Sequence, residues 1–543
     1  MKTSWKISGI VLALIVGMAM TFRSDDNKYF EITKNIEIYT NLYKELNTYY
    51  VDELDPGNLM RTGLDAMVGS LDPYTNYISE SQIESYRYMT EGRYNGIGAI
   101  SEKIGEYVTI TELYEGEAAD EAGLKVGDQI VAIDGKEARG RDEEAVNSIL
   151  RGFPGTEVTL SIRRPGVEEL ISVDLIRGEI EVPNVPYSGF VEDKVGYVVL
   201  TAFTRNSGRN VSEAIKKLKE DKPDLQGIII DLRGNPGGFL NEAVNICNIF
   251  IPKGELVVTT KGKVKDWDRP FKTLNQPMDT DLPVAVLIDE NSASASEIVS
   301  GVMQDYDRGV LLGQRTYGKG LVQQTKDIGY NSKLKLTTAK YYIPSGRCIQ
   351  SVEYEDGEPV DISEDLRGRF NTRNGRIVLD GGGVKPDIVL SQAADIPLIK
   401  SLIEQKLIFD YVTQYALQRD SIPPVEEFAF NEFDAFINFL EERNFDYETE
   451  SEKVLERLEK ISSKEGYDLD IAKIQASIRN AKREALQQNK EDIIEILEKE
   501  IAGRYYFQLG KIKMGLKNDE EIKEAVAVLK DTQRYEEILA RKN

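Results

Sequence analysis

The chain has 543 residues, too many for a single hydrophobic core, so we expect several domains. The formal net charge of −24 gives a surface that repels phosphate backbones, and nucleic acid is therefore not an expected partner. There is no histidine, which excludes the Ser-His-Asp triad, the Cys-His pair and histidine metal sites. A base that works near neutral pH must then be a lysine, carboxylate, tyrosine or cysteine with a shifted pKa.

The two cysteines, Cys247 and Cys348, are too few for a disulfide framework in a chain of this length. Cys247 lies in an apolar helical stretch over residues 243–250, which indicates a buried thiol. We expect a free, inert pair, and a disulfide between the two is the alternative.

The first 22 residues have the charge order and length of an export signal. Lys2 and Lys6 precede an uninterrupted apolar run from Ile7 to Phe22. The run is short for a membrane span, but no clear cleavage site follows it, so an uncleaved anchor is the alternative. We therefore expect a periplasmic or cell-envelope protein, tethered to the inner membrane if the segment stays in place.

Residues 23–90 are expected to be helical, because apolar residues recur at helical spacing until Asp72-Pro73 ends the pattern. Residues 91–180 change character. Short β-type runs separated by glycine turns predict a small β-rich domain there. These runs are 107–111, 129–133 and 157–162.

Residues 181–395 alternate between buried strands and helices, which predicts an α/β domain. The predicted strands are 196–200, 227–232 and 282–289, and the predicted helices are 212–219, 240–250 and 294–305. Residues 396–543 are mostly helix-forming and charged, so we expect a C-terminal helical region that packs on the rest or mediates dimerisation. The fold class is thus a multidomain α/β protein with helical regions at both ends.

The first candidate site is the string Asp289-Glu-Asn-Ser-Ala-Ser-Ala-Ser-Glu-Ile298, where a buried strand ends and a helix begins. Small residues allow a tight turn and the close approach of a substrate backbone. A serine at a helix N-terminus, such as Ser294, lies beside free backbone N–H groups and the positive end of the helix dipole. These groups stabilise a developing oxyanion, although a lone serine there is more often a simple N-cap.

The second candidate is Lys319, which lies between two glycines just before a β-type run in Gly313-Gln-Arg-Thr-Tyr-Gly-Lys-Gly-Leu-Val-Gln323. Burial would lower the pKa of this amine, and a neutral amine can remove the proton of a serine hydroxyl. A solvated turn lysine is the alternative interpretation.

The third candidate is the turn Asp231-Leu-Arg-Gly-Asn-Pro-Gly-Gly238 after a buried strand. Asn-Pro-Gly-Gly forces a tight turn with exposed N–H groups, which can form an anion-binding nest. An ordinary turn is the alternative. A phosphate loop is disfavoured because the Gly-x4-Gly-Lys-Ser/Thr pattern is absent.

Together these three strings resemble the carboxyl-terminal processing peptidases, also called tail-specific proteases. Leu71-Asp-Pro-Tyr-Thr-Asn-Tyr77, Tyr341-Tyr-Ile-Pro-Ser-Gly346 and Gly383-Val-Lys-Pro-Asp387 also resemble that family, over roughly residues 30–395. The resemblance implies a crotonase-like (ClpP/crotonase-type) protease core and a serine endopeptidase with a serine–lysine dyad. It implies no metal and no organic cofactor.

The resemblance also implies residue roles. Ser294 would be the nucleophile, Lys319 the general base, and Gln323 the residue that orients the lysine amine. The N–H of Ala295, with that of Gly237 or Gly238, would form the oxyanion hole. Glu297 would support the turn, and Ser292 and Ser296 are the competing nucleophile candidates.

The β-rich segment resembles a PDZ domain. Tyr94-Asn-Gly-Ile-Gly-Ala-Ile100 is similar to a PDZ carboxylate-binding loop, and residues 123–136 to the following strand-turn segment. This resemblance implies that Gly96, Ile97, Gly98 and Ala99 bind the C-terminal segment of a protein or peptide substrate, with β-strand addition beside them. A domain that only gates or packs is the alternative.

Two other functions remain as hypotheses. The first is an inactive protease fold that serves as a PDZ scaffold, which the presence of Ser294, Lys319 and Gln323 disfavours. The second is a penicillin-recognising enzyme, because Ser332-Lys-Leu-Lys335 has the Ser-x-x-Lys spacing. No Lys-Thr-Gly or Ser-Asp-Asn string accompanies it, and the stretch alternates like a half-exposed strand. The helical termini also suggest a homo-oligomer.

Overall fold

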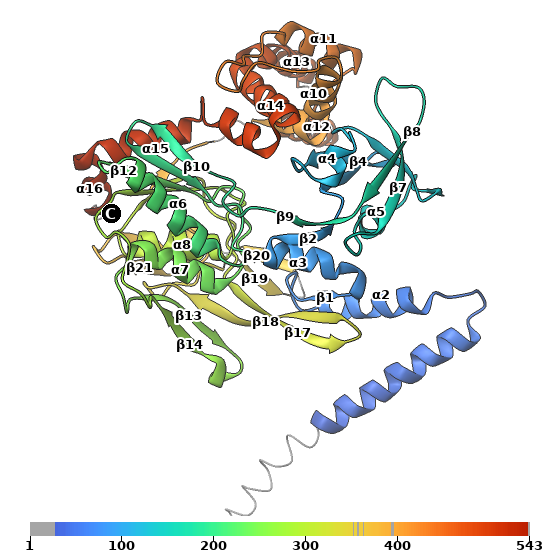
Figure 1. Cartoon of the computed structure of the whole chain (residues 1–543), viewed down its shortest axis with the longest axis horizontal. Helices are drawn as coiled ribbons and strands as arrows, with labels where there is room; N and C mark the ends of the chain where they lie inside the picture. Colours follow the sequence, from blue (N-terminus) through green and yellow to red (C-terminus); the bar gives the residue numbers. More distant parts are fainter. Residues whose placement is uncertain are drawn as a thin grey trace, which may run out of the picture. The chain divides into compact units, whose positions relative to one another are not determined.

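The computed structural model describes residues 28–350, 352–355, 358–361, 363–391, 396–467 and 469–540. The predicted export signal over residues 1–22 lies outside these ranges. The chain divides into two compact units, residues 1–77 and 78–543, which are described separately (Figure 1). In the part of the chain that the structure describes, no helix has the length and apolar content needed to cross a membrane.

The first unit is a helical hairpin, as the apolar spacing predicts. A helix over residues 28–49 is followed by α2 (Pro56–Gly69). The Asp55 carboxylate accepts the N–H groups of Gly57 and Asn58 and so caps α2 at its N-terminus. The Tyr43 hydroxyl joins the two helices by donating to the Pro56 carbonyl at 2.7 Å.

In the second unit, a 3-10 turn (Glu80–Gln82) and α3 (Ile83–Glu91) lead into a β domain. Its antiparallel sheet has the order β3-β4-β5-β7-β8, and strands β2 (Arg93–Gly96) and β9 (Gly178–Glu181) form a separate two-stranded sheet. The sheet strands are β3 (Ala99–Ile104), β4 (Tyr107–Leu113), β5 (Gln129–Ile133), β7 (Glu157–Arg163) and β8 (Ile171–Ile176). Two short helices, α4 (Ala118–Glu121) and α5 (Glu143–Leu150), pack on this sheet. The sheet and the helices together enclose the hydrophobic core of the β domain.

The α/β domain is built on a six-stranded sheet of order β10-β11-β12-β15-β16-β23, in which only β10 is antiparallel to its neighbour. The strands are β10 (Tyr187–Glu192), β11 (Val195–Val199), β12 (Gly227–Asp231), β15 (Val284–Ile288), β16 (Val310–Gly313) and β23 (Ile388–Val389). Successive side chains alternate between its two faces, and both faces are buried.

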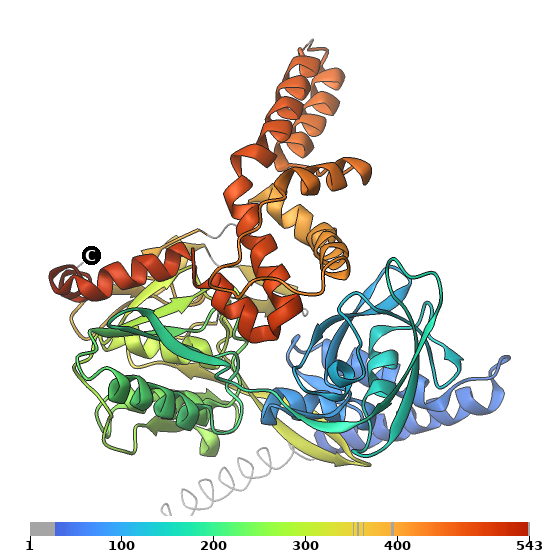
Figure 2. The same ribbon diagram turned by 45° about the horizontal axis from the view of Figure 1, so that its top comes forward.

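Helices cover both faces of this sheet (Figures 1 and 2). One face carries Ile228 and Ile230 and packs against α6 (Ser207–Asp221), α7 (Leu240–Phe250) and α8 (Ala295–Asp305). The other face carries Ile229 and packs against α15 (Glu520–Lys530) and α16 (Thr532–Ala540). The last two helices therefore complete the core of this α/β domain.

A second, antiparallel sheet lies beside this domain. It contains β17, β18, β13 and β14 in that order, namely β17 (Leu321–Gly329), β18 (Ser332–Tyr342), β13 (Leu256–Gly262) and β14 (Arg269–Lys272). Two small hairpins follow, β19 (Val352–Glu355) with β20 (Glu358–Asp361) and β21 (Arg369–Asn371) with β22 (Ile377–Leu379). Lys335 lies within β18, so Ser332-Lys-Leu-Lys335 opens a strand as its alternation predicts.

The remaining C-terminal helices form a separate apolar cluster. They are α9 (Pro397–Glu404), α10 (Leu407–Leu417), α11 (Phe433–Glu442), α12 (Glu450–Glu465), α13 (Ile471–Gln488) and α14 (Lys490–Gly515). Helix α14 is kinked where Tyr506 and Phe507 leave helical geometry, and Phe507 packs against the core of the β domain. The helices of residues 396–540 that the structure describes thus lie in a helical bundle and, for α15 and α16, on the six-stranded sheet.

The contribution of α15 to the core can be tested with Leu529→Ala. Leu529 is 3% exposed and packs among the sheet residues around Ile229. We expect the substitution to lower the free energy of unfolding by about 2–5 kcal/mol, because it leaves a cavity in a packed layer. Urea denaturation of the protein and of Val454→Ala, which removes an exposed side chain from α12, measures the difference. Equal effects of the two substitutions would contradict the assignment of α15 to the core.

Candidate active site

Three adjacent parallel strands bring the candidate motifs together. β12, β15 and β16 are neighbours in register, with Asp231 opposite Leu287 and Ile288 opposite Gly313. Their carboxyl ends therefore lie at one edge of the sheet. The segments that follow them carry the Asn-Pro-Gly-Gly turn, Ser294 and Lys319, so these distant parts of the sequence converge.

The Asn-Pro-Gly-Gly turn is hydrogen-bonded to the turn that carries Ser294. The Asn235 carbonyl accepts the N–H of Ala293 at 3.0 Å and the Ser296 hydroxyl at 2.9 Å. The Asn235 side chain accepts the N–H of Gly237 at 2.8 Å and donates to the Leu200 carbonyl at 2.7 Å. Asn235 thus fixes both turns to each other and to the end of β11.

Ser294 has a strained backbone, with φ 58° and ψ −109°, directly before α8. Both sides of this residue are held. Its N–H donates to Glu297 Oε2 at 2.7 Å, and its carbonyl accepts the Tyr341 hydroxyl at 3.1 Å. The unusual conformation is thereby maintained by the surrounding structure, and it turns a half-buried serine side chain into the cavity described below.

The two competing serines are buried and engaged in the turn itself. The Ser292 hydroxyl donates to the Leu232 carbonyl at 2.8 Å, and the Ser296 hydroxyl donates to Asn235. Both side chains are 0% exposed. Of the three serines in the string, Ser294 is the one that lines the cavity.

Glu297 connects the serine turn to the lysine segment. Besides the Ser294 N–H, its buried carboxylate accepts the Thr316 hydroxyl at 2.6 Å and the N–H groups of Gly318 and Lys319 at 2.7 and 2.8 Å. Burial raises the pKa of Glu297 to about 7, and these four hydrogen bonds oppose that shift. One carboxylate therefore holds the backbones of Ser294 and Lys319 in a fixed relation.

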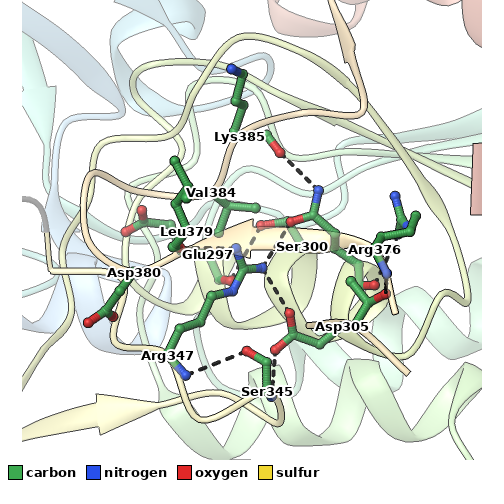
Figure 3. Close-up of polar contacts among 12 residues, drawn as sticks. Glu297, Ser300, Asp305, Ser345, Arg347, Arg376, Leu379, Asp380, Val384 and Lys385 are labelled. Carbon is green, nitrogen blue, oxygen red and sulfur yellow. Dashed lines mark hydrogen bonds and ion pairs between the residues drawn. The ribbon is translucent and has the colours of Figure 1, made fainter. Parts of the chain in front are cut away.

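The far end of α8 is anchored by a second buried carboxylate (Figure 3). Asp305 lies at the unfavourable, negative end of the helix dipole, where Arg347 pairs with it at 2.9 Å. The Ser345 N–H donates to the same carboxylate at 2.9 Å. Arg376 adds a donor to the Gln304 carbonyl at 3.2 Å and pairs with Asp307 at 2.6 Å. The helix that presents Ser294 is thus held at both ends.

A cavity of about 960 Å³ joins the candidate catalytic residues. Ser294, Lys319 and Gln323 all line it, together with β-domain residues such as Ile100 and Tyr114. The Gln323 side-chain amide donates to the Thr337 hydroxyl at 3.2 Å, which fixes the orientation of the amide and turns its oxygen away from Thr337.

The candidate oxyanion residues also line this cavity. A Cβ atom at Gly237 would lie 2.8 Å from both Ser294 Cβ and the nitrogen of Ala295, so the glycine backbone packs directly against the serine turn. Gly238, at φ 147°, lies against Phe203. The structure therefore brings Ala295, Gly237 and Gly238 to one wall of the cavity.

The predicted carboxylate-binding loop lies between β2 and β3. Gly96, Ile97 and Gly98 are buried, and Ala99 begins β3. The carbonyls of Ile97 and Gly98 accept N–H groups from Ala119 and Tyr114 at 2.8 and 3.0 Å, which holds the loop against α4 and β4.

β3 is an edge strand, the position that strand addition by a peptide requires. Helix α5 lies beside it and makes two polar contacts across the gap. The Ser101 hydroxyl donates to Asn147 at 2.7 Å, and the Lys103 N–H donates to Glu143 at 3.2 Å. A peptide that pairs with β3 must therefore displace the Glu143 carboxylate from the N–H of Lys103.

Some contributors to the site carried no predicted role. The Tyr341 hydroxyl contacts the carbonyls of both Ser294 and Lys319. In the sequence, Tyr341 belongs to a string that resembles the peptidase family but to which no role was assigned. Thr316 likewise acts through a tertiary contact that no local pattern signals. Asn235 belongs to a predicted turn, but its contacts with the serine turn were not predicted. Both cysteines are free thiols, and burial raises the pKa of each. Within the described ranges, no group of acidic, histidine or cysteine side chains could hold a metal ion.

Comparison with known proteins places the chain in a family. Residues 194–359 match the model for peptidase family S41, residues 109–164 match a PDZ domain, and residues 398–529 match "Probable PDZ-protease, C-terminal helical domain". A carboxy-terminal-processing protease of Bartonella bacilliformis is 33% identical over 357 residues, 65% of this chain and 80% of that protein. The chain belongs to peptidase family S41.

Two further similarities accompany this assignment. A "Probable CtpA-like serine protease" of Staphylococcus aureus is 36% identical over 356 residues, 65% of this chain and 70% of that protein. The solved photosystem II D1 C-terminal processing protease is 23% identical, with a TM-score of 0.36 over 65% of this chain and 92% of that one. This S41 peptidase is therefore a mixed α/β serine peptidase with a PDZ domain and a C-terminal helical region, as the sequence motifs predict.

The packing of Gly237 against the serine turn gives a test within one loop. Gly237→Ala is expected to reduce kcat/KM at least about a hundredfold, because the added methyl displaces Ser294 and the adjacent N–H groups. Gly234→Ala is the matched control, since Gly234 also has a positive φ but has open space at its Cβ position. Peptidase assays on both variants decide the matter. Equal losses would show that backbone strain alone causes the effect.

The raised pKa of Glu297 predicts how stability changes with pH. The folded pKa of about 7 lies above the ordinary 4.5, so folding takes up a proton between these values. The stability of the S41 peptidase relative to Glu297→Gln should then fall as pH rises from about 5 to about 7, by at most about 1.4 kcal/mol per unit. Urea unfolding of both proteins across this range measures the difference, and parallel stability curves would contradict the shift.

Proposed function

We propose that Ser294 is the nucleophile and Lys319 the general base of this serine peptidase. The observation that carries the proposal is the Glu297 carboxylate, which binds the backbone N–H groups of both residues beside a shared cavity. A serine and a base that are held by one rigid group and open to one cavity suit nucleophilic catalysis. The absence of histidine leaves lysine as the natural base.

Cleavage follows from these positions in two stages. The neutral amine of Lys319 takes the hydroxyl proton of Ser294 while Oγ bonds to the carbonyl carbon of the substrate. The C–N bond then breaks, the lysine returns the proton to the leaving amine, and an ester remains on the serine. Water, losing a proton to the same amine, attacks the ester. The carboxyl product leaves, and the serine recovers its proton.

Two backbone N–H groups would hold the oxyanion. Ala295 is the first residue of α8, where N–H groups lack intrahelical acceptors and the helix dipole is positive. The second donor is the N–H of Gly238, because the N–H of Gly237 is already bound to Asn235. Gln323 would orient the lysine amine through its amide oxygen, since its nitrogen donates to Thr337.

The PDZ domain would select substrates by their C-terminal segments. Gly96, Ile97, Gly98 and Ala99 form the loop that would take the terminal carboxylate, and the open edge of β3 would pair with the preceding residues. Because PDZ pockets usually prefer apolar C-terminal side chains, proteins with an apolar C-terminus are the expected substrates. The relatives named carboxy-terminal-processing protease support this reading.

Further proposals concern the setting of the enzyme. The parallel sheet with α6, α7 and α8 on one face supports a crotonase-like protease core. Residues 1–22 would direct the protein to the periplasm or cell envelope, with an inner-membrane tether if they stay uncleaved. The helical termini would provide the surfaces of a homo-oligomer.

The catalytic roles are tested with Ser294→Ala and Lys319→Ala. Each is expected to reduce the cleavage of unfolded proteins at least about a thousandfold and to leave the binding of C-terminal peptides intact. Degradation is followed for substrates with and without an apolar C-terminal tail, and peptide affinity is measured by fluorescence anisotropy. Full activity in either variant refutes the dyad. An S41 peptidase that binds tails without cleaving any substrate would instead be a PDZ scaffold.

A further inference from the structure

Lys335 is a cation of the cavity that the proposed mechanism does not use. It belongs to β18 and lines the same cavity as Ser294 and Lys319. Its place follows from the strand register, in which Lys335 is opposite Thr325 and Thr337 is opposite Gln323. Residues two apart share a face of a strand, so Lys335 follows Thr337, the partner of Gln323, along that face.

No carboxylate of the described residues pairs with Lys335, unlike its neighbour on the same strand. Lys333 pairs with Asp327, and this contact raises the pKa of Lys333. Burial alone lowers the pKa of Lys335, with no acid contributing. A cation that is removed from water without a partner is unfavourable, and an anion brought by a ligand relieves that cost.

The acids that line the cavity are committed elsewhere or lie beyond ion-pair distance of Lys335. Asp268 accepts the N–H of Gly262 at 2.7 Å. Glu112 faces the positive charges of Lys511 and Arg504. Asp266, the third acid of the lining, forms no ion pair with Lys335 within 4.0 Å in the described chain. The positive charge of Lys335 is therefore available to a substrate.

The rest of the wall is mostly apolar, with Leu321, Val322 and Phe271 near the ribbon that carries Lys335. Such a surface fits an extended apolar segment with one negative group. We propose that Lys335 binds a carboxylate of the substrate and makes the enzyme select polypeptides that carry a carboxylate close to the scissile bond. This inference rests on the proposed function, since it assumes that substrates are cleaved in this cavity.

The carboxylate can come from an Asp or Glu side chain or from the free C-terminus. Cleavage sites in unfolded proteins, mapped by mass spectrometry, test the first source. Peptides with free and amidated C-termini test the second. For the preferred source we expect a kcat/KM advantage of about tenfold over the uncharged analogue, as a charge-assisted hydrogen bond provides. Whichever of the two experiments shows this kcat/KM advantage identifies the source of the carboxylate.

Variants of Lys335 test whether this residue causes the preference for a carboxylate. Lys335→Gln should remove the advantage, Lys335→Arg should retain it, and Lys335→Glu should favour substrates with Lys or Arg at the same position. Lys333→Gln, on the same strand but paired with Asp327, should behave like the unaltered enzyme. Melting curves of each variant establish that it is folded.

The outcomes separate this inference from the catalytic proposal. Cleavage without any preference for a carboxylate, or a preference that survives in Lys335→Gln, overturns the role of Lys335 and leaves the dyad standing. Failure of the unaltered enzyme to cleave any substrate overturns both.

Discussion

The buried carboxylate of Glu297 is the constraint on which the rest of the site depends. It accepts four hydrogen bonds, from the backbones of Ser294, Gly318 and Lys319 and from the Thr316 hydroxyl. Removing a carboxylate from water is costly, and these donors offset much of that cost. The pKa of about 7, above the ordinary 4.5, shows that the cost of burial still exceeds what the four hydrogen bonds return. Glu297 binds both the serine turn and the lysine segment. If either segment moves relative to the other, hydrogen bonds to Glu297 are lost.

The strain at Ser294 is stable only because distant segments support it. Helix α8 is held at its far end by Arg347, and its near end by Asn235 and Tyr341. On the opposite face of the sheet, Glu521 of α15 binds Arg233, two residues before the Asn-Pro-Gly-Gly turn, at 2.6 Å. Helix α15 therefore supports the protease site from the opposite face of the sheet, although it begins more than a hundred residues after the site in sequence.

The cavity combines two kinds of selection. Its mostly apolar wall suits an extended chain of varied sequence, and under the proposals above single polar groups would fix where that chain reacts and which charged substrates are preferred. The PDZ loop and the edge of β3 would add recognition at a second place on the same polypeptide. For a protein with a net charge of −24, a cation such as Lys335 beside the site is a local exception that would attract acidic segments of substrate.

The sequence by itself determined the local elements and the chemistry. Continuous β-branched runs such as 227–232 predict buried strands, glycines around Lys319 mark an unusual lysine, and the missing histidine limits the choice of base. The tertiary structure decided which groups meet. Only strand order brings residues 231–238, 289–298 and 313–323 to one edge of the sheet, and only packing shows that α15 and α16 belong to the protease core. The reason is that propensity and periodicity act between near neighbours in the chain, whereas the contacts of Glu297, Tyr341 and Lys335 depend on how distant segments pack.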